Sequence, residues 1–126
     1  MIIVAGSANI DLVARVDHQP APGETLIAED YAVHDGGKGA NQAVAAARMG
    51  SRVRFVGAVG ADDFGARIRT TLEAEQIDTS ALSTLGGASG IAMISVDSAG
   101  ENCIIVVPGA NEKLGVIEDA ETVFDD

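Results

Sequence analysis

The sequence predicts an α/β fold in which a parallel, Rossmann-type sheet carries a second, smaller β-sheet. Apolar runs near residues 2–8 and 53–59 are almost continuously hydrophobic, which is typical of strands buried in a parallel sheet. Helical patterns precede and follow the second run, so the chain contains a βαβ unit. Four other segments alternate apolar and polar residues, and we expect them to pair in a sheet of their own: residues 12–16, 25–33, 90–96 and 102–107.

The first half of the chain begins with a strand predicted over residues 2–8. A turn at residues 20–23, which contain two prolines and a glycine, separates the first two alternating segments. An alanine-rich helix is expected over residues 40–49 and should end there, because Gly50 is a favourable residue just beyond a helix C-terminus.

The second half continues with the strand at residues 53–59 and a helix expected over residues 64–75. Residues 97–101 carry Gly100 between two alternating segments, and this arrangement predicts a β-hairpin. A last helix is expected over residues 114–124.

Residues 36–42, with the sequence GGKGANQ, place three glycines, Lys38 and Asn41 where a loop turns into a helix. Glycine lets a ligand approach bare backbone, and the N–H groups of a first helical turn carry partial positive charge, so the segment suits an anion or sugar hydroxyls. It is not a Walker A loop, because Gly39 stands where that motif needs Ser or Thr. It is not a dinucleotide fingerprint either, because Gln42 replaces the last glycine. From the loop alone, a tight turn before a helix remains an alternative.

A second polar group, Asn9 and Asp11, follows the first apolar run. If the extended geometry persists, residues two apart project to the same side, beyond the carboxyl end of the strand, where open α/β sheets bind ligands. A carboxylate can accept hydrogen bonds from two hydroxyls, and an amide can both donate and accept, so the pair suits vicinal hydroxyls. An Asx turn that ends the strand is the competing interpretation.

Taken in order, the segments GSANID (6–11), PGET (22–25) and GGKGANQA (36–43) closely resemble the N-terminal half of ribokinases in the PfkB family of carbohydrate kinases. The resemblance continues through VGADDFG (59–65), GEN (100–102) and GAN (109–111), and covers nearly the whole chain. In that family a late Gly-Ala-Gly-Asp motif supplies the catalytic base and the anion hole, and the sequence contains no match to it. The tetrad at residues 60–63 lacks the glycine before the aspartate, so we expect it to be structural.

The resemblance implies a ribokinase-like fold, with the alternating strands forming a lid over the sugar and a homodimer formed through that lid. It implies that sugar hydroxyls are held by Asn9, Asp11, Gly37, Lys38 and Asn41, with Asp11 the principal acceptor. Apolar contacts to the sugar would come from Ala92, Ile94 and Val106. The implied reaction transfers the γ-phosphoryl group of ATP to the C5 hydroxyl of D-ribose, with Mg²⁺ and a monovalent cation such as K⁺. No catalytic residue is expected in this chain, which should be inactive alone.

Composition excludes several other classes. The formal net charge is −11, with only eight Lys and Arg residues, which argues against binding nucleic acid. Apolar runs are too short to span a membrane and the start lacks a signal-peptide pattern, so we expect a cytoplasmic protein. We expect Cys103 to be a small core residue. His18 and His34 lack partners at metal-binding spacing, so no metal site is expected.

Two other functions stay open at this stage. The chain could be a sugar- or nucleoside-binding module without turnover, or a dimerisation fragment that binds no sugar. Within the kinases, fructose or a nucleoside remains an alternative substrate, because substrate choice also depends on residues outside this sequence.

Overall fold

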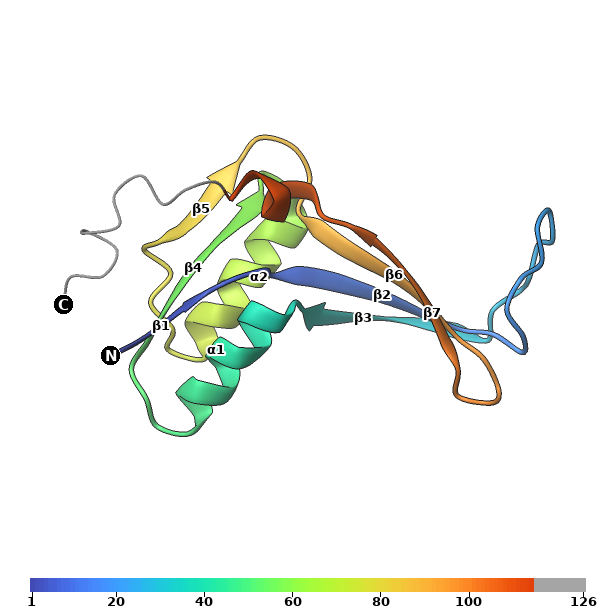
Figure 1. Ribbon diagram of the computed structural model, residues 1–126, viewed down its shortest axis with the longest axis horizontal. Helices are drawn as coiled ribbons and strands as arrows, with labels where there is room; N and C mark the ends of the chain where they lie inside the picture. The colour runs from blue at the N-terminus through green and yellow to red at the C-terminus, as the bar shows by residue number, and fades with distance from the viewer. Residues whose placement is uncertain (115–126) are drawn as a thin grey trace.

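The computed structural model describes residues 1–114, and Figure 1 shows a core of helices and short strands from which a longer sheet projects. The expected helix over residues 114–124 lies outside the described residues, apart from its first position. The elements follow one another as β1 (Ile2–Ala5), β2 (Asn9–Arg15), β3 (Asp30–Gly36), α1 (Lys38–Arg48), β4 (Val53–Gly60), α2 (Asp63–Ala74), β5 (Leu82–Leu85), β6 (Gly90–Val96), β7 (Asn102–Val107) and the 3₁₀ helix η1 (Gly109–Lys113).

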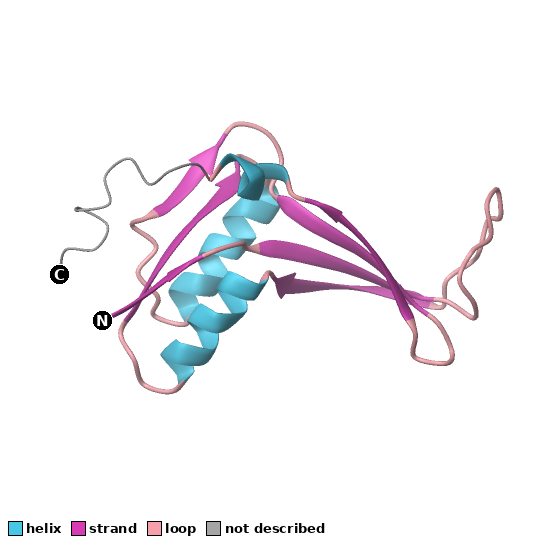
Figure 2. Cartoon of the chain, viewed as in Figure 1, coloured by secondary structure: helices cyan, strands magenta, loops and turns pink. Residues whose placement is uncertain are grey.

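The core is a parallel sheet with strand order β1-β4-β5. β4 is its most buried strand, and Phe55 on it is completely inaccessible to solvent. α1 and α2 lie side by side against these strands (Figure 2) and contribute Ala43, Ile68 and Leu72 to one apolar cluster around Phe55. The predicted βαβ unit is therefore present. Burial of such large apolar side chains stabilises the fold by about 1.5–3 kcal/mol each.

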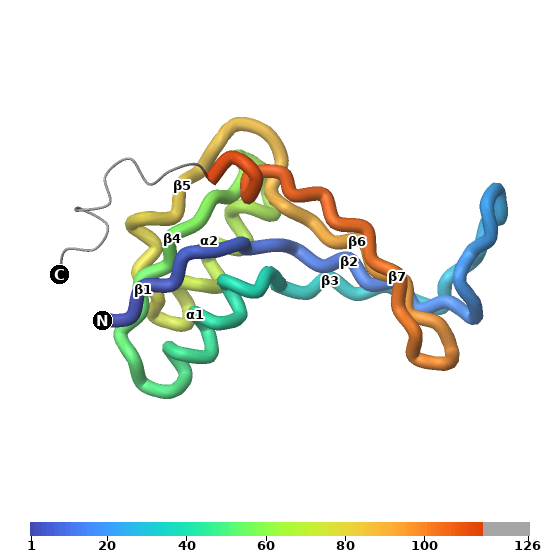
Figure 3. Tube along the Cα trace, in the orientation of Figure 1, coloured from blue at the N-terminus to red at the C-terminus, as the bar shows by residue number. Residues whose placement is uncertain are grey.

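The second sheet has the strand order β3-β2-β6-β7 and is here called the projecting sheet. β2 pairs antiparallel with β3 and parallel with β6, while β6 and β7 form the predicted antiparallel hairpin, with Gly100 at φ 80° in its turn. In the trace of Figure 3 the sheet extends away from the helices, and residues 16–29 loop at its far end. The predicted fold class, an α/β fold with a parallel core and a second sheet, is confirmed, but among the described residues the second sheet is the larger one, with four strands against three.

The prediction of one continuous strand over residues 2–8 is wrong, because β1 ends at Ala5 and β2 begins at Asn9. The break has a physical cause at the intervening residues. Gly6 still bonds to the core through its N–H to the Val56 carbonyl, whereas the Ser7 carbonyl accepts a hydrogen bond from the α1 amide of Ala40 at 3.0 Å. The chain thus leaves the core sheet at this point and enters the projecting sheet.

The strand predicted at residues 25–33 is shifted in the structure, where β3 covers Asp30–Gly36. Its partner β2 ends at Arg15, which is in register with Asp30, and the next residue, Val16, instead donates to the Val96 carbonyl. The Glu29 amide still donates to the Arg15 carbonyl at 2.9 Å, and residues 25–28 have no strand beside them for ladder pairing. The prediction also missed β5, a short edge strand of the core.

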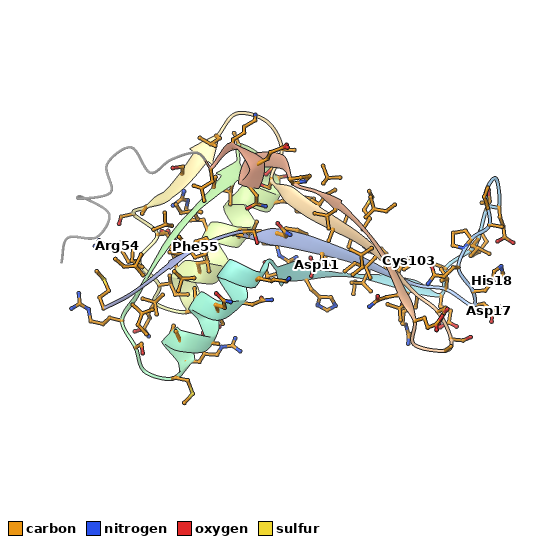
Figure 4. All side chains as sticks on the ribbon, viewed as in Figure 1. Asp11, Asp17, His18, Arg54, Phe55 and Cys103 are labelled. Carbon is orange, nitrogen blue, oxygen red and sulfur yellow. The ribbon has the colours of Figure 1, made fainter. Side chains whose placement is uncertain are left out.

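Two expectations about burial are wrong. The β1 run was expected to be buried, but β1 lies at the edge of the described core sheet and Ile2 is 44% exposed. Cys103 was expected in the core, but it lies on the outer strand β7 and is exposed, far from Phe55 (Figure 4). The helix ends fit better: α1 stops at Arg48, and Gly50 has the positive φ (90°) expected beyond a helix. None of the helices among residues 1–114 has the length and hydropathy needed to cross a membrane.

Candidate functional site

The glycine loop packs directly on the segment that joins the two sheets. Gly37, at φ 92°, precedes α1, and a Cβ atom on it would lie 2.6 Å from the Ser7 carbonyl oxygen and 2.8 Å from the Ala8 Cα. Only glycine fits both the backbone conformation and the space. The neighbouring Ala40 amide bonds to the Ser7 carbonyl. The start of α1 and the start of β2 are therefore held together.

One face of the projecting sheet gathers most of the sequence-predicted site residues. Strand pairing places Asp11 opposite Ala92, and Ala92 opposite Val106. Cross-strand partners share a face, and so do residues two apart on a strand. The predicted residues on this face are Asn9, Asp11, Ala92, Ile94 and Val106. We call it the Asp11 face, and Figure 4 shows Asp11 in the half of the sheet next to the helices.

The Asp11 carboxylate is half-buried and makes no hydrogen bond or ion pair within residues 1–114. Burial raises the pKa of Asp11 above its usual value; His34, its register partner on β3, opposes the shift, and Asp35 adds to it. Space for this carboxylate depends on Gly36, since a Cβ atom there would lie 2.6 Å from the Asp11 Cγ. The arrangement leaves an unpaired hydrogen-bond acceptor on an otherwise largely apolar face.

Asn9, beside Asp11 on the same face, is held by a residue from the end of the described chain. Its Oδ1 accepts a hydrogen bond of 2.6 Å from the Nδ2 of Asn111 in η1. No described residue accepts a hydrogen bond from the Nδ2 of Asn9. The Asn9 amide therefore keeps two N–H donors for a ligand.

Lys38 and Asn41 occupy the first turn of α1. Lys38 is exposed, and its ammonium group makes no hydrogen bond or ion pair among the described residues. Asn41 lines a small cavity together with Asn9 and Gly36, which places it at the base of the projecting sheet. It also lines a wider groove between α1 and α2. Gly37, Lys38 and Asn41 thus flank the Asp11 face from the helix side.

The tetrad at residues 60–63 has the structural role expected for it. Asp62 is the N-cap of α2: its Oδ1 accepts from the Gly65 amide at 2.8 Å, and its two oxygens accept from the Ser89 hydroxyl at 2.6 Å and the Ser89 amide at 2.8 Å. Ser89 is almost completely buried and also accepts a hydrogen bond from the Gly60 amide. Burial alone would raise the pKa of Asp62, but these hydrogen bonds outweigh it and lower the pKa below its usual value. Its carboxylate is fully engaged and is not available as a base.

Four of the six arginines in residues 1–114 are engaged with carboxylates. Arg15, Arg48, Arg54 and Arg67 each pair with a carboxylate, at distances of 2.8, 2.5, 2.7 and 3.2 Å. A triphosphate needs several free cationic or backbone donors at one place. Within residues 1–114, no group of three or more His, Cys, Asp or Glu side chains is arranged to hold a metal ion.

Fold and site together define an α/β domain whose second sheet presents polar side chains beside the ends of a parallel sheet. The chain belongs to the pfkB family of carbohydrate kinases, because the model of that family, described as "pfkB family carbohydrate kinase", matches residues 1–125.

Individual relatives agree with this membership. The chain is 42% identical to the ribokinase of Haemophilus influenzae over 114 residues, which are 90% of this chain and 37% of the relative. It is similar to the crystal structure of a ribokinase from Thermotoga maritima, with 44% identity and a TM-score of 0.81 over 86% of this chain and 36% of that one. It is also similar to the structure of an Arabidopsis thaliana ribokinase complexed with ribose and ATP. The two share 34% identity and a TM-score of 0.80 over 87% of this chain and 36% of that one. The chain thus spans little more than a third of the length of the relatives it matches.

Sequence reasoning missed three residues that shape this face. Gly36 was treated only as part of the glycine-rich loop, His34 was considered only as a metal ligand, and Asn111 was noted only as part of the GAN segment at residues 109–111. A strand assignment ending at Gly36 would have aligned His34 with Asp11. The contact between Asn9 and Asn111 spans 102 positions, and no local pattern indicates it.

Proposed function

We propose that this chain is the sugar-binding part of a kinase that transfers the γ-phosphoryl group of ATP to D-ribose, giving ribose 5-phosphate. The observation that carries the proposal is the unpaired, half-buried Asp11 carboxylate, which shares a face with the free amide donors of Asn9. An unpartnered charge of this kind costs stability unless a ligand satisfies it. Hydroxyl groups of a sugar do so, because each can donate one hydrogen bond and accept others.

The surrounding residues fit the same ligand. Ala92, Ile94 and Val106 offer an apolar surface on which the C–H groups of a sugar ring can lie. Lys38 and Asn41, at the start of α1, provide further donors next to this surface. A site that combines one carboxylate, several amide donors and an apolar floor selects neutral polyols over anions.

We assign no step of phosphoryl transfer to this chain. Transfer needs a base near the acceptor hydroxyl and charge stabilisation around the phosphoryl group. Asp62 is engaged in capping α2, and the described arginines named above are paired, so the nucleotide, Mg²⁺ and a cation such as K⁺ would bind to residues other than these. The chain would position the acceptor sugar, and alone it should not phosphorylate it.

Calorimetric titration with ribose, fructose and adenosine tests the proposal. Ribose should bind, and Asp11→Ala should weaken its binding by about 1.5–3 kcal/mol through loss of charge-assisted hydrogen bonds. Gly36→Ala should also weaken binding, because the added methyl group displaces the Asp11 carboxylate. Gly86→Ala is the matched control, since a Cβ atom there meets nothing within 4 Å.

Unchanged ribose affinity in both Asp11→Ala and Gly36→Ala would reject the site. Tighter binding of adenosine or fructose than of ribose would instead reassign the substrate. Ribose binding followed by no turnover, even when a complementing C-terminal part and ATP are supplied, would favour a binding module without catalysis.

The proposal includes a homodimer formed through the projecting sheet, which acts as a lid. The face opposite the Asp11 face contains an apolar groove of about 490 Å³, whose lining includes Leu12, Tyr31, Met93 and Ile105. Tyr31 and Ile105 are 77% and 63% exposed. A second copy of the same sheet would cover this groove by a two-fold contact, with burial worth about 25 cal/mol per Å² before association costs.

A further inference from the structure

The Asn111 side chain connects the end of the described chain to the residues that start β2. Its Oδ1 accepts a hydrogen bond of 3.1 Å from the Ala8 amide, and its Nδ2 donates to the Ala8 carbonyl at 3.2 Å. The same Nδ2 donates to the Pro108 carbonyl at 3.2 Å and to the Asn9 Oδ1 at 2.6 Å. Asn111 thus contacts both the backbone and the side chain at the edge of the proposed sugar site.

The chemistry of these contacts determines which way both amides face. A backbone N–H can only donate, so the Asn111 atom next to the Ala8 amide must be the oxygen. The other terminal atom of Asn111 is then the nitrogen, and the Asn9 atom facing that nitrogen must be an acceptor. Asn9 therefore turns its oxygen toward Asn111 and keeps its NH₂ group for other partners.

The backbone around this contact leaves room for it. Gly90, at the start of β6 and in register with Asn9, faces both amides, and a Cβ atom there would lie 2.6 Å from the Asn9 Oδ1 and closer still to the Asn111 Nδ2. Ala110, next to Asn111, is buried and donates its amide proton to the Ala88 carbonyl, which fixes η1 in place. Because Gly90 and Ala110 are both held in place, the Asn111 side chain has little freedom to turn.

We propose that Asn111 is a positioning residue that sets the hydrogen-bonding polarity of the sugar site; this inference rests on the function proposed above. With Asn111 in place, Asn9 presents only donors and Asp11 only acceptors on one face. Residues two apart on a strand are about 7 Å from each other, which two adjacent hydroxyls can bridge. One hydroxyl accepts from Asn9 and its neighbour donates to Asp11, so the site selects a vicinal diol over a sugar that lacks one of the two groups.

The test is a double-mutant cycle on ribose and 2-deoxyribose affinity, with folding of each variant checked by urea unfolding. Asn111→Asp keeps the oxygen that accepts from Ala8 but replaces the donor, so Asn9 must turn its NH₂ toward residue 111 and its oxygen toward the sugar. We expect ribose affinity to fall about tenfold, while in an Asn9→Ala background Asn111→Asp should change it less than twofold. Glu112→Gln, a change at the exposed neighbour, should leave affinity unchanged.

An equal loss of affinity in both backgrounds would overturn the inference, because Asn111 would then act only through the backbone. A second measurement needs no sugar and so separates this inference from the proposed function. In the unmodified chain, the side-chain amide protons of Asn111 should exchange slowly with water and those of Asn9 rapidly, as followed by NMR. Protected Asn9 protons would overturn the assigned polarity even if ribose binds.

Discussion

Replacing Asp62 by alanine should destabilise the chain more than any other exchange of a partly exposed acidic residue in its described part. The substitution removes the N-cap of α2, which costs about 1 kcal/mol in most helices. It also leaves the Ser89 amide and hydroxyl without their acceptor, and Ser89 is only 1% exposed, so each unmet donor adds about 1 kcal/mol. The expected loss in the free energy of unfolding is about 2–4 kcal/mol, by urea denaturation at pH 7.

The pH dependence provides a stricter check of the same argument. The hydrogen bonds to Asp62 lower its pKa in the folded chain, so the stabilisation is present above the unfolded-state pKa and is lost as the pH falls through the folded-state value. The difference between the parent and Asp62→Ala should therefore shrink below pH 3.8. Asp63→Ala, next to it in the exposed first turn, is the control and should cost about 0.5 kcal/mol. Equal losses for the two variants, or a difference that persists in acid, would refute the reasoning.

Three further predictions concern other parts of the molecule. Asp78→Asn should lower the free energy of unfolding by about 1 kcal/mol at pH 7, a figure that allows for the partial solvent exposure of Asp78. The reason is that hydrogen bonds from Ser80 and Arg54 lower the pKa of Asp78 to about 2. Urea denaturation should show that the loss fades between pH 3.8 and 2. Ribose affinity, measured by titration calorimetry, should rise with pH through the raised pKa of Asp11, since the ionised form is the better acceptor, and a flat profile would contradict this role. Light scattering should show a dimer that Ile105→Lys dissociates and that Met49→Lys leaves intact, because Met49 is 86% exposed at the C-terminal end of α1, outside the projecting sheet; a parent monomer at micromolar concentration would exclude the lid dimer.

The sequence predicts those parts of the fold that local chemistry determines. Gly100 and the alternation around it indicated the β6–β7 hairpin with its observed bounds, and Gly50 indicated the end of α1. Elements whose limits depend on a partner strand were placed less well. β3 begins where β2 provides a neighbour, and Cys103 is exposed because β7 has no strand on its outer side in the described sheet. Neither fact is visible in a local pattern.

The same distinction applies to the candidate site. Asn9 and Asp11 could be placed on one face from their spacing alone, since strand periodicity is a local property. Their ability to act together depends on contacts from residues remote in sequence: Gly36 makes room for the Asp11 carboxylate, and Asn111 orients the Asn9 amide. Such contacts require the tertiary fold, so sequence reasoning could propose candidate binding side chains but not what orients them.

In the proposed function, the junction between the two sheets would link sugar binding to the position of the projecting sheet. Residues 6–8 connect the core strand β1 to β2 of the projecting sheet, and they are held from two directions, by the Ala40 amide on Ser7 and by Asn111 on Ala8. Asn9 follows directly, so it cannot move far without disturbing one of these bonds. In the function proposed above, closure of the sheet over a sugar would bend the strands farther out along β2, β3 and β6, with Asn9 and Gly37 as the fixed end.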